Sequence, residues 1–158
     1  MTDAPESHAT TPDYEACQKK ARDRDRLAGE ALVTNKAALF DALSAFHITI
    51  VTVRFDGCGD SGQIEEVEAE AGGSDIALPE IAIEIARPLY DGSGTGRLTL
   101  PLRDAIEQLA YDFLGQTHSG WPNDDGAFGE FAFDVAKRSI TLAYNERYTE
   151  TEFSEHSW

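Results

Sequence analysis

Basic residues are scarce in this sequence. Its 158 residues include 29 acidic side chains against 13 lysines and arginines, which gives a formal net charge of −16 at pH 7. Nucleic-acid backbones and anionic membrane surfaces attract proteins that carry a positive field. The composition therefore argues against direct binding to nucleic acid or to a membrane. It leaves open an acidic surface that faces a partner, a metal site, or acidity that serves only solubility.

Cysteine and long hydrophobic runs are also scarce. Cys17 and Cys58 form no repeated metal-ligand spacing, so they fit two reduced thiols or a single disulfide. No apolar run has the length of a membrane span, and no secretory signal follows Met1. We therefore predict a cytoplasmic protein with no bound cofactor.

The length fits a single domain with a loose end. Residues 1–11 have no hydrophobic periodicity and are predicted to be disordered. A Thr-Pro-Asp run at 11–13 is typical of a helix start. Residues 12–158 are predicted to form one α+β domain. Within it, the polar stretch 12–33 is either a solvated, loosely attached helix or an arm that orders on a partner.

Periodicity predicts two helices in the rest of the chain. After Thr34, the apolar residues Leu39, Phe40, Leu43 and Phe46 recur at helical spacing. A second helix follows Pro101, and its apolar stripe consists of Leu102, Ala105, Ile106, Leu109, Ala110, Phe113 and Leu114.

Two hairpins are predicted by period-two patterns. HITIVTVRF at 47–55 pairs with QIEEVEAEA at 63–71, and GEFAFDV at 129–135 pairs with ITLAYNERYTE at 140–150. The expected fold is α+β in the order α-ββ-α-ββ, with helices packed on one face of an antiparallel sheet of four to five strands. The stretch 71–99 is poorly patterned and predicts at most one short strand.

The second strand has an acidic pattern. Glu66, Glu68 and Glu70 alternate with Val67 and Ala69. Since alternate side chains of a strand point to opposite faces, the three acids are predicted to share one solvent-exposed face.

The tetrapeptide GDSG at 59–62 matches the surroundings of the nucleophile in trypsin-like proteases. Such a protease needs a histidine base, a buried aspartate and two β-barrels, and the chain is too short for them. Gly, Asp and Ser are also the residues that a tight turn requires. We therefore interpret Ser61 as part of a hairpin turn and predict no enzymatic activity for it.

The segment WPNDDG at 121–126 places Asn123, Asp124 and Asp125 beside Trp121. Its spacing fails the calcium-loop pattern. Two interpretations stay open: a strand-entry turn in which Trp121 covers the core, or a binding loop. Exposed aromatic surface near Trp121 and Tyr148 is a further candidate for partner binding.

A metal-dependent or enzymatic site has weaker support. Asp56, Asp60 and His118 are its candidate ligands, together with Asn123, Asp124 and Asp125 of the loop. Such a site requires the turn at 56–63 and the loop at 118–126 to lie at the same end of the sheet. His118 also fits a helix C-terminal position, where a histidine interacts favourably with the helix dipole.

Three stretches carry a resemblance to a known group of proteins: residues 53–66, 109–135 and 140–156. They resemble a family of small uncharacterised proteins carried on bacterial plasmids and other mobile elements. The resemblance covers most of 46–156. It implies an α+β fold and a genomic context, and no established activity.

Three functions are compatible with the sequence. The first is an acidic, non-enzymatic interaction protein that binds another protein with a basic surface, in its sharpest form a DNA mimic or an inhibitor of a host defence or restriction system. The second is the small enzyme or metal-dependent site, and the third is a structural or regulatory module without a ligand. Homodimerisation is left open. The candidate partner-binding residues are Glu66, Glu68, Glu70, Trp121, Asn123, Asp124, Asp125 and Tyr148.

Overall fold

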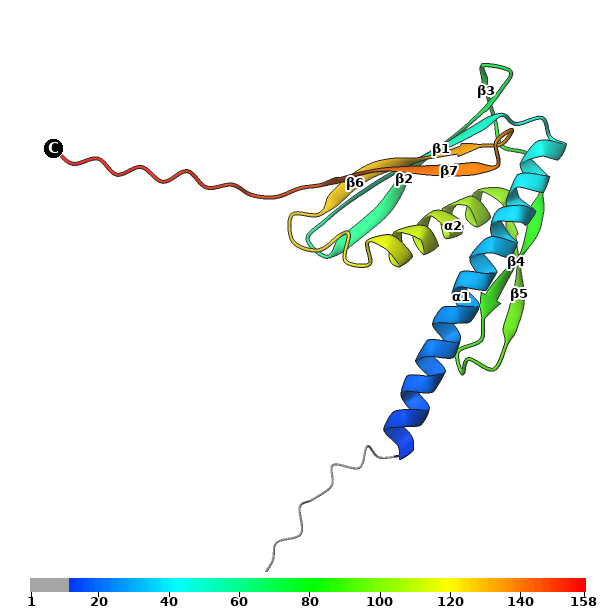
Figure 1. Ribbon diagram of the computed structural model, residues 1–158. Helices are drawn as coiled ribbons and strands as arrows, with labels where there is room; N and C mark the ends of the chain where they lie inside the picture. Colours follow the sequence, from blue (N-terminus) through cyan, green and yellow to red (C-terminus); the bar gives the residue numbers. More distant parts are fainter. Residues whose placement is uncertain (1–11) are drawn as a thin grey trace, which may run out of the picture.

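The computed structural model describes residues 12–158, which form two helices and seven strands (Figure 1). The helices are α1 (Pro12–Ala45) and α2 (Leu102–Thr117). The strands are β1 (Ile50–Cys58), β2 (Ser61–Ala71), β3 (Ser74–Ile76), β4 (Ala82–Pro88), β5 (Thr95–Pro101), β6 (Ala127–Asp134) and β7 (Ser139–Glu146). Five strands form one antiparallel sheet in the order β3-β2-β1-β6-β7, and β4 and β5 form a second sheet. The predicted α+β class is confirmed.

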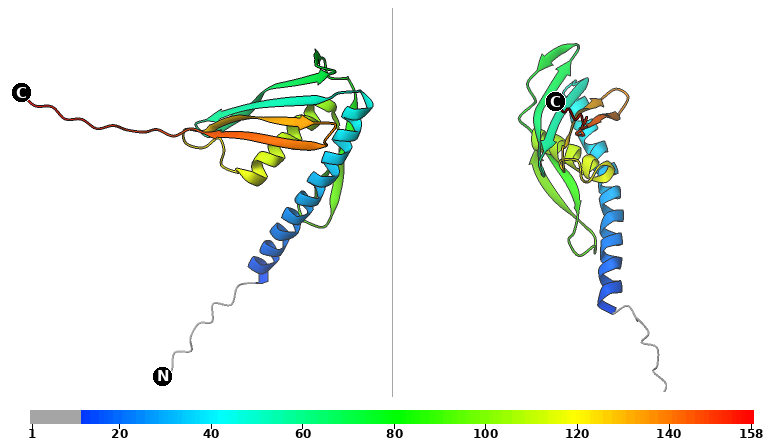
Figure 2. Two further views of the ribbon diagram at one scale, coloured as in Figure 1. Left: turned by 45° about the horizontal axis from the view of Figure 1, so that its top comes forward. Right: turned by 90° about the vertical axis from the view of Figure 1, so that its left-hand side faces the viewer.

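The core lies between one face of the five-stranded sheet and the two helices. Helix α2 runs beneath the sheet, and α1 crosses at the end where β1 begins (Figures 1 and 2). The fully buried side chains that meet there include Leu39, Phe40, Leu43, Val51, Val53, Ile106, Leu109, Leu114 and Phe133. The stripe predicted for α2 is buried except at Phe113, which is only partly buried. The opposite face of the sheet is covered by no element of residues 12–158.

Two apolar residues of the predicted patterns are exposed. Phe46 follows the last residue of α1 and is 43% exposed, because the helix ends one residue before the stripe does. Ile50 points to the uncovered face of β1, whereas Ile48 is buried just before the strand. Strand β1 is therefore central, with partners on both sides, but it is covered on one face only.

Helix α1 is continuous over 34 residues, so the polar stretch 12–33 belongs to the same helix as the apolar stripe. Ala31 and Leu32 are buried. Residues 13–22 are exposed. The predictions for residues 1–11 lie outside the described residues. Neither helix among residues 12–158 combines the length and the apolar character needed to cross a membrane.

The β4–β5 hairpin lies alongside α1 (Figure 1), and of it only one short strand, around residues 81–85, was predicted. Asn35 of α1 is 2% exposed and connects the two. Its amide nitrogen donates to the carbonyl oxygen of Ala86 (2.9 Å), and the amide of Ala86 donates to Asn35 Oδ1 (2.6 Å). At the tip, a Cβ on Gly92 would lie 3.0 Å from the carbonyl oxygen of Lys20, so the turn packs against the helix.

Candidate functional site

The uncovered face of the sheet carries rows of acids on both sides of β1. Glu66, Glu68 and Glu70 of β2 share this face, as their alternation predicted, since they lie opposite the outward residues of β1. From β6, Glu130 and Asp134 lie on the same face on the other side of β1. We name the outward side chains of β1, β2 and β6 the open acidic face.

Arg54 is the base at the centre of the open acidic face. Its guanidinium bonds to Glu66 and lies 3.6 Å from Glu68 and 3.4 Å from Glu130. All four side chains are about half exposed, so each pair contributes little to stability. One arginine therefore orients three carboxylates without neutralising them.

The pKa values within this cluster diverge because two carboxyl groups interact with each other. The hydrogen bond from Glu68, with help from Arg54, lowers the pKa of Glu66. The same hydrogen bond and the negative charge of Glu66 raise the pKa of Glu68. Glu68 therefore takes up a proton at a higher pH than Glu66. This is expected when two neighbouring carboxylates repel each other and one arginine does not compensate both charges.

The GDSG segment forms the β1–β2 turn, as predicted. Cys58 pairs with Ser61, so Gly59 and Asp60 are the two central residues. Both have positive φ, +59° and +67°, which is the conformation of a two-residue hairpin turn that matches strand twist. His47 precedes β1 and Ser61 follows it, so a nine-residue strand of about 3.4 Å per residue separates them.

Ser61→Ala is expected to leave the protein folded, with a change in the free energy of unfolding within about 0.5 kcal/mol. Ser61 is exposed, and its place in the turn rests on backbone pairing with Cys58. Thermal unfolding monitored by circular dichroism measures the effect. A loss of several kcal/mol would show that the hydroxyl has a structural role that the turn geometry does not explain.

The β1–β2 turn and the 118–126 loop lie at the same end of the sheet. The amide of Gly59 donates to the carbonyl oxygen of Asp124 (3.2 Å), and that of Asp60 donates to the carbonyl oxygen of Pro122 (3.0 Å). The space between them is filled by Trp121, because a Cβ at Gly62 would overlap its ring. The two segments therefore meet through backbone bonds and a packed indole.

Trp121 is a core residue with 9% exposure and not an exposed anchor for a partner. Its ring meets Phe55 edge-on at 5.4 Å between centroids. Of the two interpretations of the loop, the structure has the one in which Trp121 covers the core. Asn123, Asp124 and Asp125 are exposed beside it.

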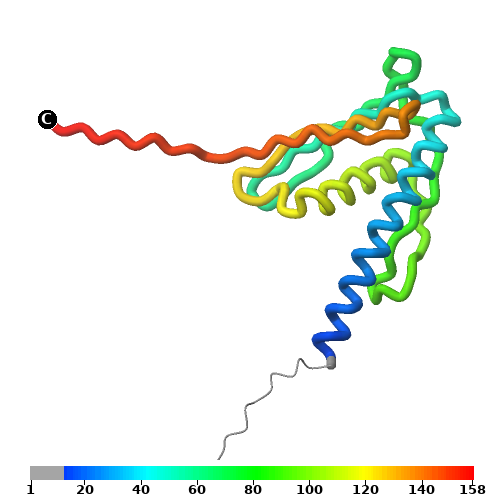
Figure 3. Tube along the Cα trace, in the orientation of Figure 1, coloured from blue at the N-terminus to red at the C-terminus, as the bar shows by residue number. Residues whose placement is uncertain are grey.

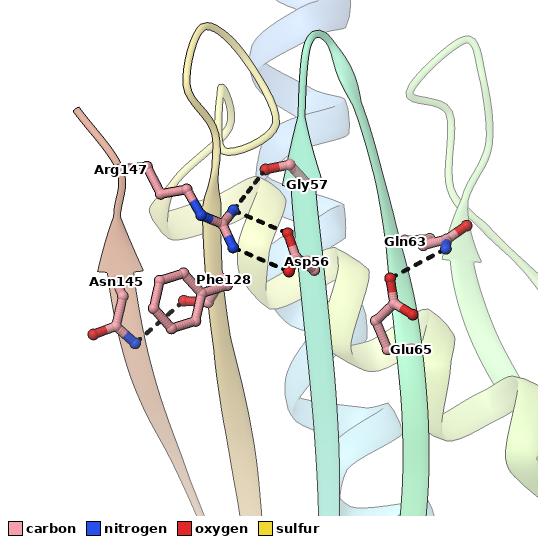
Figure 4. A network of polar contacts seen from close by, with 7 residues as sticks. All are labelled: Asp56, Gly57, Gln63, Glu65, Phe128, Asn145 and Arg147. Atoms are coloured by element: carbon pink, nitrogen blue, oxygen red, sulfur yellow. Dashed lines mark hydrogen bonds and ion pairs between the residues drawn. The ribbon is translucent and has the colours of Figure 1, made fainter. Parts of the chain in front are cut away.

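Two of the candidate metal ligands, Asp56 and His118, are used in other contacts. Arg147 Nη1 and Nη2 donate to the two carboxylate oxygens of Asp56 at 2.9 and 3.0 Å, and Nη1 also donates to the carbonyl oxygen of Gly57 (Figure 4). The same guanidinium lies 4.6 Å from the ring centroid of Phe128. His118 ends α2 and stacks on Tyr144 at 3.7 Å. Among residues 12–158, no group of three or more acidic, cysteine or histidine side chains is placed to hold a metal ion.

Tyr148 lies near the loop acids and away from the core. It is 80% exposed, just past the end of β7. Thr149 Oγ1 donates to Asp125 Oδ2 at 2.6 Å, and the amide of Arg147 donates to the carbonyl oxygen of Gly126. The structure therefore brings the loop acids and Tyr148 together, on a surface distinct from the row at Glu66–Glu70.

A cleft of about 1090 Å³ lies between α1, α2 and the β4–β5 hairpin, and the sequence did not predict it. Arg24, Arg87 and Arg97 line it, together with the partly buried Asp112. Burial raises the pKa of Asp112, which accepts a hydrogen bond from Gln108. No sequence signal connects the three arginines, because the hairpin that carries two of them is held in place by tertiary contacts with α1.

The chain belongs to the family of unknown function DUF6878, which matches residues 31–158. Membership of an uncharacterised family agrees with the resemblance noted in the sequence. No curated protein and no solved structure matches the chain. The matched region includes the open acidic face and every residue after β7, whereas most of the polar first half of α1 lies outside it.

Proposed function

We propose that the protein is a non-enzymatic interaction protein whose open acidic face binds a basic surface of another protein. One observation carries this proposal: the acids of β2 and β6 converge on the single guanidinium of Arg54, on a sheet face that no described element covers. The net charge of −16 adds a negative long-range field to that of the open acidic face.

The electrostatics of the open acidic face favour a cationic partner. Glu66 and Glu68 lie side by side on this face, and the interaction between their carboxyl groups raises the pKa of Glu68. A lysine or arginine that approaches this pair reduces the repulsion between the carboxylates. Such an arrangement increases the rate of encounter with a basic surface and selects against acidic ones.

The sharpest form of the proposal is a DNA mimic that inhibits a host defence or restriction protein. Its support is the acidic row itself, together with the resemblance to proteins of mobile elements. Alternate residues of one strand lie about 6.8 Å apart, roughly twice the axial spacing of about 3.4 Å between phosphates of one DNA strand. Neighbouring phosphates also wind around the helix axis, so their separation through space exceeds the axial spacing and is closer to that of the acidic row.

The enzymatic alternative has less support. Asp56 is bound by Arg147, and the space between the turn and the loop is filled by Trp121. A substrate would have to displace packed side chains at this end of the sheet.

Reversal of two acids tests the proposal. Glu66→Lys with Glu68→Lys is expected to abolish capture of a basic partner from a lysate of cells that carry the protein. The matched control is Glu30→Lys with Glu80→Lys, which has the same net charge but changes exposed acids that are not part of the open acidic face. The control should capture the partner as the wild type does, and about 1 M salt, where the Debye length is about 3 Å, should release it.

Competition separates the general proposal from its sharpest form. If the face mimics DNA, duplex DNA should displace the protein from the captured partner, and the partner should bind that DNA directly. Capture that survives both salt and the Glu66→Lys/Glu68→Lys change would contradict the proposal, and the surface around Tyr148 would then be the better candidate.

A further inference from the structure

The residues after β7 form an extended arm. Residues 148–158, which we name the C-terminal arm, continue the direction of β7 and leave the body of the protein (Figures 1 and 3). Every residue of the arm is exposed, including Tyr148 at 80%, Phe153 at 81% and Trp158 at 109%. Large aromatic side chains exposed in this way are typical of a surface that binds a partner.

The composition of the arm is acidic, aromatic and suited to an extended conformation. It contains Glu150, Glu152 and Glu155, with threonines between the first acids, and it has neither glycine nor proline. Threonine and aromatic residues favour strands. The family match includes the whole arm, so it is part of the matched domain and not an appendage to it.

The cleft between α1, α2 and the β4–β5 hairpin is lined by basic and apolar side chains that complement the acidic and aromatic ones of the arm. Arg87 and Arg97 lie exposed at its edge, where Arg97 also pairs with Glu84 at 2.8 Å, and Arg24 lies over the ring of Tyr90 at 5.6 Å. Two acids, Asp25 and Asp112, line it as well, but Asp112 is partly buried against α2. The apolar lining includes Leu32, Ile85, Leu89 and Leu98. The cleft is thus an apolar groove with arginines along its rim, in a protein that is otherwise strongly acidic.

We propose that the C-terminal arm of one molecule docks in this cleft of a second copy of the chain. Alternate side chains of an extended segment point to opposite sides. Phe153 therefore enters the apolar floor while Glu150 and Glu152 face the rim arginines. Eleven extended residues span at most about 36 Å, which is longer than the seven-residue strand β4 that borders the cleft.

The arm is directed toward another molecule and not back onto its own. Its start is fixed by the bidentate pair between Arg147 and Asp56 and by the hydrogen bond between Thr149 and Asp125. From there it runs away from the β4–β5 hairpin and the first half of α1 (Figure 2). Glycine, proline, asparagine and aspartate favour reversal of the chain within a few residues, and the arm contains none of these four.

Reciprocal docking of two arms closes a two-fold dimer. The cleft lies among α1, α2 and the β4–β5 hairpin, and the arm leaves the sheet beyond the pair between Arg147 and Asp56 (Figure 1), so each dimer would still present the acidic row of β2 on both copies. This inference does not rest on the proposed function and can hold or fail without it.

Two full-length double variants test the docking of the arm in the cleft of a second copy, by sedimentation velocity. The arm variant carries Glu150→Lys and Glu152→Lys, and the cleft variant carries Arg87→Glu and Arg97→Glu. All four positions are exposed, so both variants should fold, as circular dichroism would verify. We expect the wild type to form a concentration-dependent dimer. Each variant alone should have a dimer dissociation constant at least about tenfold higher.

Mixing the two variants gives the decisive result. The lysine-bearing arm of one variant then faces the glutamate-bearing cleft of the other, and the unmodified arm faces the unmodified cleft, so the mixture should form a heterodimer. Arg22→Glu with Arg26→Glu, on the same helix as Arg24 but outside the cleft, should dimerise as the wild type does. A wild type that stays monomeric, a dimer that persists in both variants, or a mixture that remains monomeric would each overturn the proposal.

Discussion

Phe55→Ala is expected to lower the free energy of unfolding by about 3–5 kcal/mol, the range for truncation of a buried aromatic side chain. Phe55 is 2% exposed and lies where the β1–β2 turn, α2 and the 118–126 loop come together. Its ring lies 5.4 Å from Trp121, 5.7 Å from Phe131 and 6.3 Å from Tyr144. Truncation leaves a cavity among three rings that are themselves held by other contacts, so the site cannot collapse easily.

Urea denaturation followed by tryptophan fluorescence measures this loss, because Trp121 contacts the substituted ring. Phe153→Ala, measured at a protein concentration at which the chain is monomeric, is the matched control, since it removes the same side chain from a position that is 81% exposed in the single molecule. The control should change the free energy of unfolding by less than about 0.5 kcal/mol. Equal effects of the two substitutions would show that the loop is not docked on the sheet through Phe55.

Gly126→Ala is expected to cost at least about 2 kcal/mol, because two independent penalties add at this position. The residue has φ of +81°, which L side chains rarely adopt. A Cβ there would also overlap the backbone of β1 at the carbonyl of Gly57. Gly126 accepts the hydrogen bond from the amide of Arg147, so displacement of its backbone would also disturb the start of the C-terminal arm.

Gly115→Ala provides the contrast for this prediction. Gly115 lies in α2 with nothing within 4 Å of the added Cβ, and alanine is favoured over glycine in a helix by up to about 1 kcal/mol. The thermal midpoint should therefore rise slightly for Gly115→Ala and fall sharply for Gly126→Ala. Similar midpoints for both variants would contradict the close packing of the loop against β1.

Local patterns were sufficient to predict the elements that form the main core. Helix α2 and the two hairpins of the large sheet have clear periods of 3.6 and 2, and the positive φ values at Gly59 and Asp60 agree with the turn chemistry of GDSG. The β4–β5 hairpin has no such signal. Its placement depends on Asn35, 51 residues from its partner Ala86, and a helical asparagine does not reveal that it will bond to a strand.

Surface features likewise divide into those that follow from the pattern of one strand and those that depend on residues distant in the sequence. The row of Glu66, Glu68 and Glu70 follows from alternation within one strand, so its shared face was predictable. The pair between Asp56 and Arg147 joins residues 91 positions apart, and no local pattern connects them. The cleft depends on three elements that are distant in the sequence, and only the folded chain brings its arginines together.

The central claim is that the open acidic face, and not the overall charge, binds basic surfaces. The most direct measurement is a fluorescence titration with a labelled oligolysine peptide. It compares the wild type, the Glu66→Lys/Glu68→Lys variant and the Glu30→Lys/Glu80→Lys control. The salt concentration is raised from about 0.1 M to about 1 M, because the Debye length then falls from about 10 Å to about 3 Å. We predict that the control keeps most of the wild-type affinity at low salt, that the face variant loses it, and that high salt removes the difference. Equal weakening in both variants would mean that only net charge matters and would contradict the claim.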